Sequence, residues 1–289
     1  MQGVILAGGF GTRLAPTTIA VNKHLLTIYD KPMIFYSLSN LLLAGCTEIL
    51  VVSTDDGCNN IPKVLGNGDH LGIKIDYIVQ DSPKGIPSAI NECKEHINND
   101  EFWVTLGDNF IFGSRIDEIF KKANNDKSSS IFIKEVGNIN GLGEATIKSN
   151  RITNFEEKPN RDTKGYAVTG LYKFDTRFFE YFKTIKPSKR EETEIIDILS
   201  QYNKVDNLNY HLFGRGVSWV DAGTNDQLLL VSNFVKNLQT LNRSLVCSPE
   251  QIALNLGYIN SDKILKYIDL KYSNSEYGES LREFIKDLK

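Results

Sequence analysis

The chain has 289 residues, of which 41% are hydrophobic and 24% are charged, values typical of a globular protein with a sizeable core. Its formal net charge of −3 gives no electrostatic case for binding nucleic acid or a membrane surface. No apolar run approaches the roughly 18 to 20 residues of a membrane span, and the N-terminus lacks the features of a signal peptide. The four cysteines form no CxxC pair and the four histidines have no metal-ligand spacing, so we expect reduced thiols, no zinc and a cytoplasmic protein.

In the first half of the chain, short apolar runs alternate with helical patterns. Helices are predicted at residues 34–44 and 87–97, and strands at residues 3–7, 49–53, 75–79 and 102–106. Strands separated by helices imply βαβ units, and therefore a parallel sheet with right-handed crossovers.

The second half of the chain changes character. Residues 129–174 are rich in strand patterns, which predicts antiparallel additions to one side of the sheet. A helix is expected at residues 193–202 and another strand at residues 211–219. Beyond residue 226, with no linker before them, helical patterns cover residues 227–241, 249–254, 262–268 and 277–288.

These elements predict a Rossmann-like α/β fold with a mixed, mainly parallel sheet flanked by helices. We expect one domain at residues 1–226, made of a first half at about 1–110 and a second half at about 111–226. Residues 227–289 would form a helical C-terminal extension packed on this body.

A glycine-rich loop follows the first predicted strand. Its sequence is GGFGTRLAPTT, from Gly8 to Thr18, and Lys23 follows shortly after. A loop with few side chains lets backbone N–H groups approach an anion closely, and Arg13 and Lys23 add cationic donors. Neither GxxxxGK[ST] nor GxGxxG is present, and a tight turn would explain two glycines alone. The loop together with both cations is typical of a triphosphate site.

Polar side chains follow three predicted strands. Asp108 comes just after the strand at residues 102–106, and Asp221 follows an apolar strand far downstream. Two such carboxylates could hold one Mg²⁺, which prefers few carboxylates together with water and substrate phosphates. A turn or a helix cap is the alternative for each aspartate alone. Gln80 offers one amide donor and one acceptor, which match the edge of thymine or uracil.

The motifs together resemble those of the sugar-1-phosphate nucleotidylyltransferases. The resemblance rests on GxGTRLxPxT with Lys23, on LGD at Asp108, on EKP at Glu157 and Lys158, and on WVDAGT at Asp221. It covers nearly the whole chain and extends to the short glucose-1-phosphate thymidylyltransferases through IYDKPMIFY, YAVTGLY and CSPEQIA. It implies an enzyme that transfers a nucleotidyl group from dTTP to glucose 1-phosphate with Mg²⁺ as cofactor and releases pyrophosphate.

The resemblance also implies roles for individual residues. Arg13 and Lys23 would hold the triphosphate, Lys158 would bind the sugar phosphate, and Asp108 and Asp221 would bind the metal. The expected nucleotide-binding residues are Leu6, Gly8, Gly9, Gly11, Thr12, Arg13, Gln80, Pro83, Gly85 and Asp108. The expected sugar-phosphate-binding residues are Gly143, Glu157, Lys158, Val168, Thr169 and Arg190.

Some positions depart from the family pattern. Leu142 stands where a sugar-side tyrosine is usual, so a sibling enzyme that uses UTP, CTP or another phosphorylated acceptor is an alternative. A non-catalytic nucleotide-sugar-binding subunit is a further alternative, but it would be expected to lack the charged catalytic residues that are all present here. Ser114 and either Leu254 or Asn255 replace residues of the family's regulatory site, which leaves end-product inhibition open.

The predicted helix at residues 227–241 has more apolar positions than one narrow stripe can hold: Leu228, Leu229, Leu230, Val231, Phe234, Val235 and Leu238. A helix that is apolar on two sides buries one on its own sheet and the other elsewhere. The second side could lie beneath the other C-terminal helices or in a subunit interface. Resemblance to tetrameric thymidylyltransferases favours the interface and a homotetramer.

Overall fold

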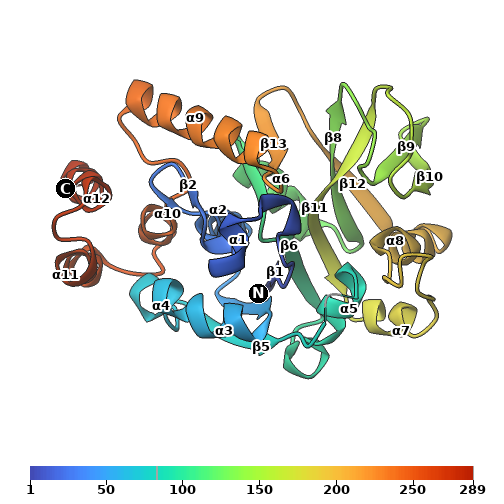
Figure 1. Ribbon diagram of the computed structural model, residues 1–289, viewed down its shortest axis with the longest axis horizontal. Coiled ribbons are helices and arrows are strands. Elements are labelled where there is room, and N and C mark those ends of the chain that lie inside the picture. Colours follow the sequence, from blue (N-terminus) through green and yellow to red (C-terminus); the bar gives the residue numbers. More distant parts are fainter. Residues whose placement is uncertain (83, 289) are drawn as a thin grey trace.

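A nine-stranded mixed sheet forms the centre of the molecule (Figure 1). The structure is a computed structural model that describes residues 1–82 and 84–288. The strands of this sheet are β1 (Gln2–Ala7), β4 (Glu48–Ser53), β5 (Lys74–Val79), β6 (Glu101–Leu106), β8 (Ser129–Val136), β9 (Glu144–Lys148), β10 (Arg151–Glu156), β11 (Gly165–Asp175) and β12 (Leu208–Phe213). The order is β10-β9-β11-β6-β1-β4-β5, with β8 paired to β11 and β12 paired to β8.

The four predicted N-terminal strands are parallel neighbours, as expected. β1 lies between β4 and β6, and β5 pairs with β4. Successive side chains of a strand point to opposite faces of the sheet. Val4 and Leu6 therefore pack in one core cluster and Ile5 and Ala7 in another, which is why the run is apolar without alternation.

Helices cover both faces of the sheet. They are α1 (Thr17–Ala20), α2 (Ile34–Leu43), α3 (Asp55–Asn60), α4 (Pro62–Leu65), α5 (Ile86–Asn91), α6 (Ile116–Asn125), α7 (Arg177–Phe182), α8 (Ile195–Lys204), α9 (Asn225–Asn242), α10 (Pro249–Asn255), α11 (Ser261–Lys271) and α12 (Glu276–Asp287). α2, α6 and α10 to α12 share one core cluster, and α5, α7 and α8 share the other. Figure 1 shows α11 and α12 at one end of the molecule and β9 and β10 at the opposite end. In the described part of the chain, no helix is long and apolar enough to cross a bilayer.

The strand-rich second half adds antiparallel strands, as predicted, because β11 runs antiparallel to β6, β8 and β9. The single strand expected at residues 211–219 is wrong. Gly214 and Gly216 flank a turn that divides it into β12 and β13 (Val217–Asp221). β13 pairs antiparallel with β7 (Asn109–Gly113) in a separate small sheet.

Two further local differences concern short elements. The helix expected at residues 87–97 ends at Asn91 and is followed by a 3-10 turn at Lys94–His96. A small hairpin joins β2 (Thr27–Ile28) to β3 (Lys31–Pro32). Other 3-10 turns lie at Thr12–Leu14, Lys23–Leu25 and Asp69–Leu71.

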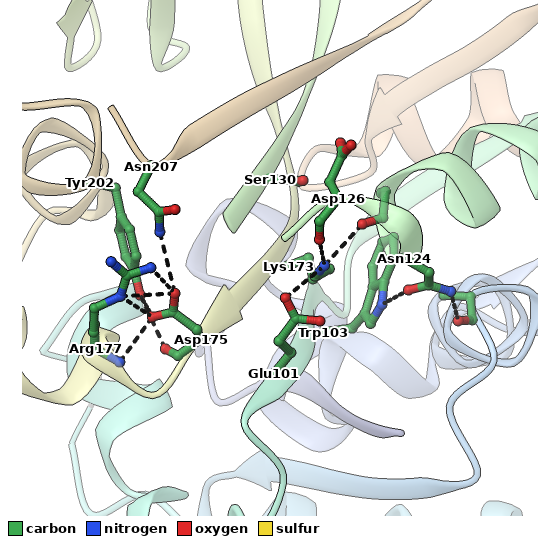
Figure 2. Close-up of polar contacts among 12 residues, drawn as sticks. Glu101, Trp103, Asn124, Asp126, Ser130, Lys173, Asp175, Arg177, Tyr202 and Asn207 are labelled. Carbon is green, nitrogen blue, oxygen red and sulfur yellow. Dashed lines mark hydrogen bonds and ion pairs between the residues drawn. The ribbon is translucent and has the colours of Figure 1, made fainter. Parts of the chain in front are cut away.

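A buried lysine ties β11 to the end of α6 (Figure 2). The Lys173 side chain is fully buried, and its ammonium pairs with Glu101 Oε1 at 2.9 Å. It also donates to the backbone carbonyls of Ala123 and Asp126, at 2.9 and 2.7 Å. These carbonyls lie at the C-terminal end of α6, where that of Ala123 also accepts from the Asp126 N–H at 3.2 Å. The three donors of the buried ammonium are therefore satisfied, and the ammonium caps the helix.

Asp175, at the end of β11, ties the same strand to α7 and α8. Its carboxylate accepts hydrogen bonds from the Arg177 guanidinium and, at 3.0 Å, from the Tyr202 hydroxyl (Figure 2). The two networks hold a long strand in a fixed position beside β6. Val168, Gly170 and Tyr172 of the same strand line the cleft described next.

Candidate active site

A cleft of about 360 Å³ lies at the carboxyl ends of the parallel strands and extends over the antiparallel half. Open α/β sheets bind ligands at this edge. Residues from both halves of the predicted domain line it. The predicted site residues among them are Leu6, Gly8, Gly9, Arg13, Lys23, Gln80, Gly85, Asp108, Gly143, Glu157, Lys158, Val168 and Asp221.

The glycines of the loop are places where other site residues approach the backbone. A Cβ atom on Gly8 would lie 2.4 Å from Gln80 Oε1, and one on Gly9 would lie 3.2 Å from Lys23 Nζ. The backbone, the amide and the ammonium therefore share one small volume. The Gln80 amide nitrogen is buried and has no hydrogen-bond partner among the described residues. A buried donor without a partner is costly, so it is available to a ligand.

The two aspartates are brought together by the small β7–β13 sheet. Asp221 pairs in register with Asn109, and the Ala222 N–H donates to the Asp108 carbonyl oxygen at 2.9 Å. Burial raises the pKa of Asp221, and the negative charge of Asp108 raises it further. Both aspartates line the cleft.

Each aspartate also faces a cation from the glycine-loop side of the cleft. Lys23 Nζ lies 2.5 Å from Asp108 Oδ2, and an Arg13 nitrogen lies 3.8 Å from Asp221 Oδ2. Burial by itself would raise the pKa of the Asp108 carboxyl, but the Lys23 ammonium, together with the other neighbouring groups and the hydrogen bond from Asn109, holds the pKa well below its ordinary value. Asp108 is therefore an anion at neutral pH.

The aspartate pair fits a magnesium ion. Mg²⁺ is bound by one or two carboxylates, with water and substrate phosphates completing its shell. The like charges of Asp108 and Asp221 would be relieved by a divalent cation. Among the described residues there is no cluster of three or more His, Cys, Asp and Glu side chains that could hold a metal without a substrate.

The other wall of the cleft carries the EEKP segment. Lys158 has a left-handed backbone with φ of 47°, and its ammonium lies 3.9 Å from Glu157 Oε1. Arg190 pairs with Glu157 Oε1 at 3.3 Å and with Glu194 Oε1 at 2.8 Å. Burial raises the pKa of Glu157, and the neighbouring Glu194 raises it further. The wall thus offers both cationic donors and carboxylate acceptors to a phosphorylated polyol.

Several predicted site residues lie outside the set that lines the cleft. Gly11 (φ 63°) and Thr12 form the turn that begins the 3-10 helix of the loop. Arg190 is exposed and contacts the cleft through Glu157 and Glu194. Pro83 lies outside the described residues.

Thr169 and Gly170 mark an irregularity in β11. The Thr169 hydroxyl is buried and donates to the Phe132 carbonyl oxygen at 2.8 Å. A Cβ atom on Gly170 (φ 68°) would lie 2.7 Å from Leu106 Cδ1, and the register with β8 shifts here. A glycine inside a strand indicates that another group approaches the backbone closely, and at Gly170 that group is the Leu106 side chain.

Residue-based reasoning missed several side chains of the cleft, including His24 and Trp219. His24 is fully buried with Nδ1 at 2.9 Å from Asn22 Oδ1 and no partner for Nε2 among the described residues. Burial, together with the Lys23 charge, lowers the pKa of His24 to about 3, so its ring is neutral. Trp219 Nε1 donates to Asn109 Oδ1 at 2.6 Å. The sequence signal for His24 is its position next to Lys23, and that for Trp219 is its position two residues before Asp221.

Comparisons with known proteins place the chain in a family. Residues 2–237 match the nucleotidyl transferase family model. The chain belongs to the nucleotidyl transferase family, which confirms the resemblance found in its motifs.

Individual proteins similar to the chain are glucose-1-phosphate thymidylyltransferases. A glucose-1-phosphate thymidylyltransferase of Neisseria meningitidis serogroup A is 38% identical over 288 residues, which cover 99% of this chain and 100% of that protein. One from Mycolicibacterium smegmatis is 36% identical over 91% of this chain and 92% of its own length. A Bacillus anthracis crystal structure with sucrose, described as a candidate glucose-1-phosphate thymidylyltransferase, has a TM-score of 0.74 at 35% identity, covering 81% of this chain and 94% of that one.

Proposed function

We propose that this enzyme transfers a thymidylyl group from dTTP to glucose 1-phosphate. A phosphate oxygen of glucose 1-phosphate attacks the α-phosphorus, the bond between the α-phosphorus and the bridging oxygen breaks, and pyrophosphate leaves with that oxygen. The observation that carries the proposal is that the glycine loop with Gln80 and the EEKP wall with Lys158 line one cleft, with the aspartate pair at the same site. The full-length similarity to glucose-1-phosphate thymidylyltransferases supports it.

The residues of this chain act mainly by positioning two anions and by offsetting charge. Arg13 and Lys23, beside the open backbone of the glycine loop, bind the triphosphate and stabilise the negative charge that develops on pyrophosphate. Lys158 binds the phosphate of the acceptor and directs its oxygen to the α-phosphorus. Asp108 and Asp221 would hold Mg²⁺, which when bound supplies Lewis acidity and a template for the phosphates.

The experiment that tests this function is a pyrophosphate-release screen of dTTP, UTP, CTP and GTP against several sugar 1-phosphates. We expect product with dTTP and glucose 1-phosphate, formed only with a divalent cation. Two results would contradict the proposal. One is release of pyrophosphate from a nucleotide in the absence of any sugar phosphate, and the other is no release from any of the four nucleotides.

The same screen tests the role of Gln80 in base selection. Its buried amide matches the acceptor and imide donor of thymine and uracil, whereas the cytosine ring nitrogen is an acceptor. We expect Gln80→Ala to lower kcat/KM for dTTP by about tenfold and to change that for CTP little, since one hydrogen bond to a buried group is lost. Gln227→Ala, at an exposed position, is the matched control. If CTP is the best substrate of the unaltered enzyme, the thymidylyl assignment is wrong.

A second candidate is a sibling enzyme with another nucleotide or acceptor. The observation that favours it is Leu142, which lines the cleft between Gly141 and Gly143 and offers no hydrogen bond to a sugar hydroxyl. Activity of the unaltered enzyme with UTP, CTP or an acceptor other than glucose 1-phosphate above that with the proposed pair would select this candidate.

We also propose that the enzyme is a homotetramer with the helical extension in its interface. Val231 and Val235 of α9 are buried on the body, whereas Leu229 and Leu230 are 62% and 57% exposed. Exposed leucines in one helical turn mark a surface that another chain can cover. Light scattering should give a particle well above 32.5 kDa, and Leu229→Ser with Leu230→Ser should reduce its mass.

Val205→Ser, which changes a 56% exposed apolar residue at the end of α8 and outside the helical extension, is the control for the oligomer experiment and should leave the particle mass unchanged. An active monomer at micromolar concentration would contradict the assembly. The division of the chain at residue 226 and the cytoplasmic location stay predictions.

A further inference from the structure

Thr193 connects the two walls of the cleft. Its backbone N–H donates to the Lys84 carbonyl oxygen at 2.8 Å, and its hydroxyl donates to the same oxygen at 2.9 Å. The Ser88 N–H donates to the Thr193 hydroxyl oxygen at 3.2 Å, although the two residues lie 105 positions apart in the sequence. The hydroxyl is therefore both donor and acceptor, and one side chain joins residues 84–88 to residues 192–194.

The start of α5 explains why a hydroxyl is needed at this place. The N-cap of α5 is Gly85, which has no side chain to accept from the N–H groups of the first turn, and Pro87 has no N–H to donate. The Ser88 N–H would be left without a partner. Thr193 supplies the missing acceptor from a distant segment.

The backbones of the two segments also touch. A Cβ atom on Gly85 (φ 100°) would lie 2.1 Å from the Thr193 carbonyl oxygen and 2.8 Å from its nitrogen. Only glycine permits both this conformation and this approach. A displacement of residues 192–194 would therefore be transmitted directly to the start of α5.

The joined segments belong to opposite sides of the proposed reaction. Gln80 and Gly85 lie on the nucleotide side, Glu157 and Glu194 lie on the acceptor side, and all of them line the cleft together with Thr193. Figure 1 shows α5 beside α7 and near α8, at one edge of the sheet. The Thr193 contact lies where α5 and α8 begin.

We propose that Thr193 is a positioning residue that couples nucleotide binding to acceptor binding. The inference rests on the proposed function. A nucleotide that orders residues 84–88 also orders residues 192–194 through the shared hydrogen bonds, so the acceptor binds to a segment whose conformational entropy is already reduced. Because such coupling is reciprocal, the acceptor strengthens nucleotide binding by the same factor.

Three variants separate the hydroxyl from the rest of the side chain. Thr193→Val removes the hydroxyl at nearly constant shape, and Thr193→Ser retains it. Thr184→Val makes the same change on an exposed threonine whose hydroxyl donates only locally, to the Tyr181 carbonyl oxygen at 2.8 Å, and serves as the control.

Hydrogen exchange measured by mass spectrometry reads the contact without any turnover. In the ligand-free protein, exchange of the Ser88 amide should be about tenfold faster in Thr193→Val than in the unaltered protein, because its hydrogen-bond acceptor is lost. Thr193→Ser and Thr184→Val should exchange like the unaltered protein. Equal exchange in all four proteins would overturn the role of Thr193.

Adding dTTP alone then tests the coupling. Exchange at residues 80–85 should slow in all four proteins, whereas exchange at residues 188–196 should slow only in those that retain the Thr193 hydroxyl. In steady-state kinetics, the KM for dTTP should fall several-fold as glucose 1-phosphate is raised, and this dependence should disappear in Thr193→Val and persist in Thr193→Ser.

The same dependence in Thr193→Val as in the unaltered enzyme would overturn the coupling. If dTTP does not slow exchange at residues 80–85 in any of the four proteins, and none of them forms product, the proposed function is contradicted instead. The ligand-free exchange would then still decide whether Thr193 holds α5.

Discussion

Asp221→Asn is expected to lower kcat by about 10²- to 10³-fold, the range observed when one group that stabilises transition-state charge is removed. Asp221 and Asp108 are the two carboxylates that the β7–β13 sheet brings to the same part of the cleft. An asparagine retains the oxygen that accepts the Gly223 N–H bond, 3.0 Å in length, so the fold should be preserved. Steady-state kinetics with a titration of Mg²⁺ checks the loss, and circular dichroism checks the fold.

Asp226→Asn is the matched control for this variant. Asp226 is an exposed carboxylate in the first turn of α9, five residues along the chain from Asp221 and outside the residues that line the cleft. Its loss should leave kcat nearly unchanged. Full activity of Asp221→Asn, or of the unaltered enzyme in excess chelator, would show that the aspartates do not hold a required metal.

Replacement of the two phosphate lysines is expected to give different kinetic phenotypes. Lys158→Ala should raise the KM for glucose 1-phosphate by about 10- to 100-fold and change the KM for dTTP little, because a charged hydrogen bond to the acceptor phosphate is lost. The Lys158 side chain is about half exposed on the EEKP wall, remote in sequence from the glycine loop. Initial rates with each substrate varied in turn measure the difference.

Lys23→Ala should act mainly through the nucleotide. Lys23 packs against Gly9 and pairs with the buried Asp108, so its loss removes a triphosphate donor and leaves an anion without its partner. We expect kcat/KM for dTTP to fall by at least about 100-fold. Lys186→Ala, at an exposed position, is the control for both variants. Equal effects of Lys23→Ala and Lys158→Ala on both substrates would contradict separate roles.

The parallel core and the helical extension could be predicted from the sequence because their signals are local. The run Gly3 to Ala7 is apolar without alternation since both of its faces are covered, and this pattern appears within five residues. Turn residues and helical periodicity likewise lie within each element. The strand expected at residues 211–219 failed because the pattern is apolar on both sides of the Gly214–Gly216 turn, and only the pairing partners distinguish β12 from β13.

The sequence by itself determined the parts of this protein that depend on local chemistry: the buried strands, the glycine-rich loop and the residue types suited to phosphate, metal and base. Only the tertiary structure decided which of them meet. Lys23 reaches Asp108 across 85 positions, the β7–β13 ladder aligns Asp221 with Asn109, and Thr193 caps a helix 105 positions away. Such contacts leave no periodic trace in the chain, because their register follows from how the sheet, the small β-ladder and the helices pack together.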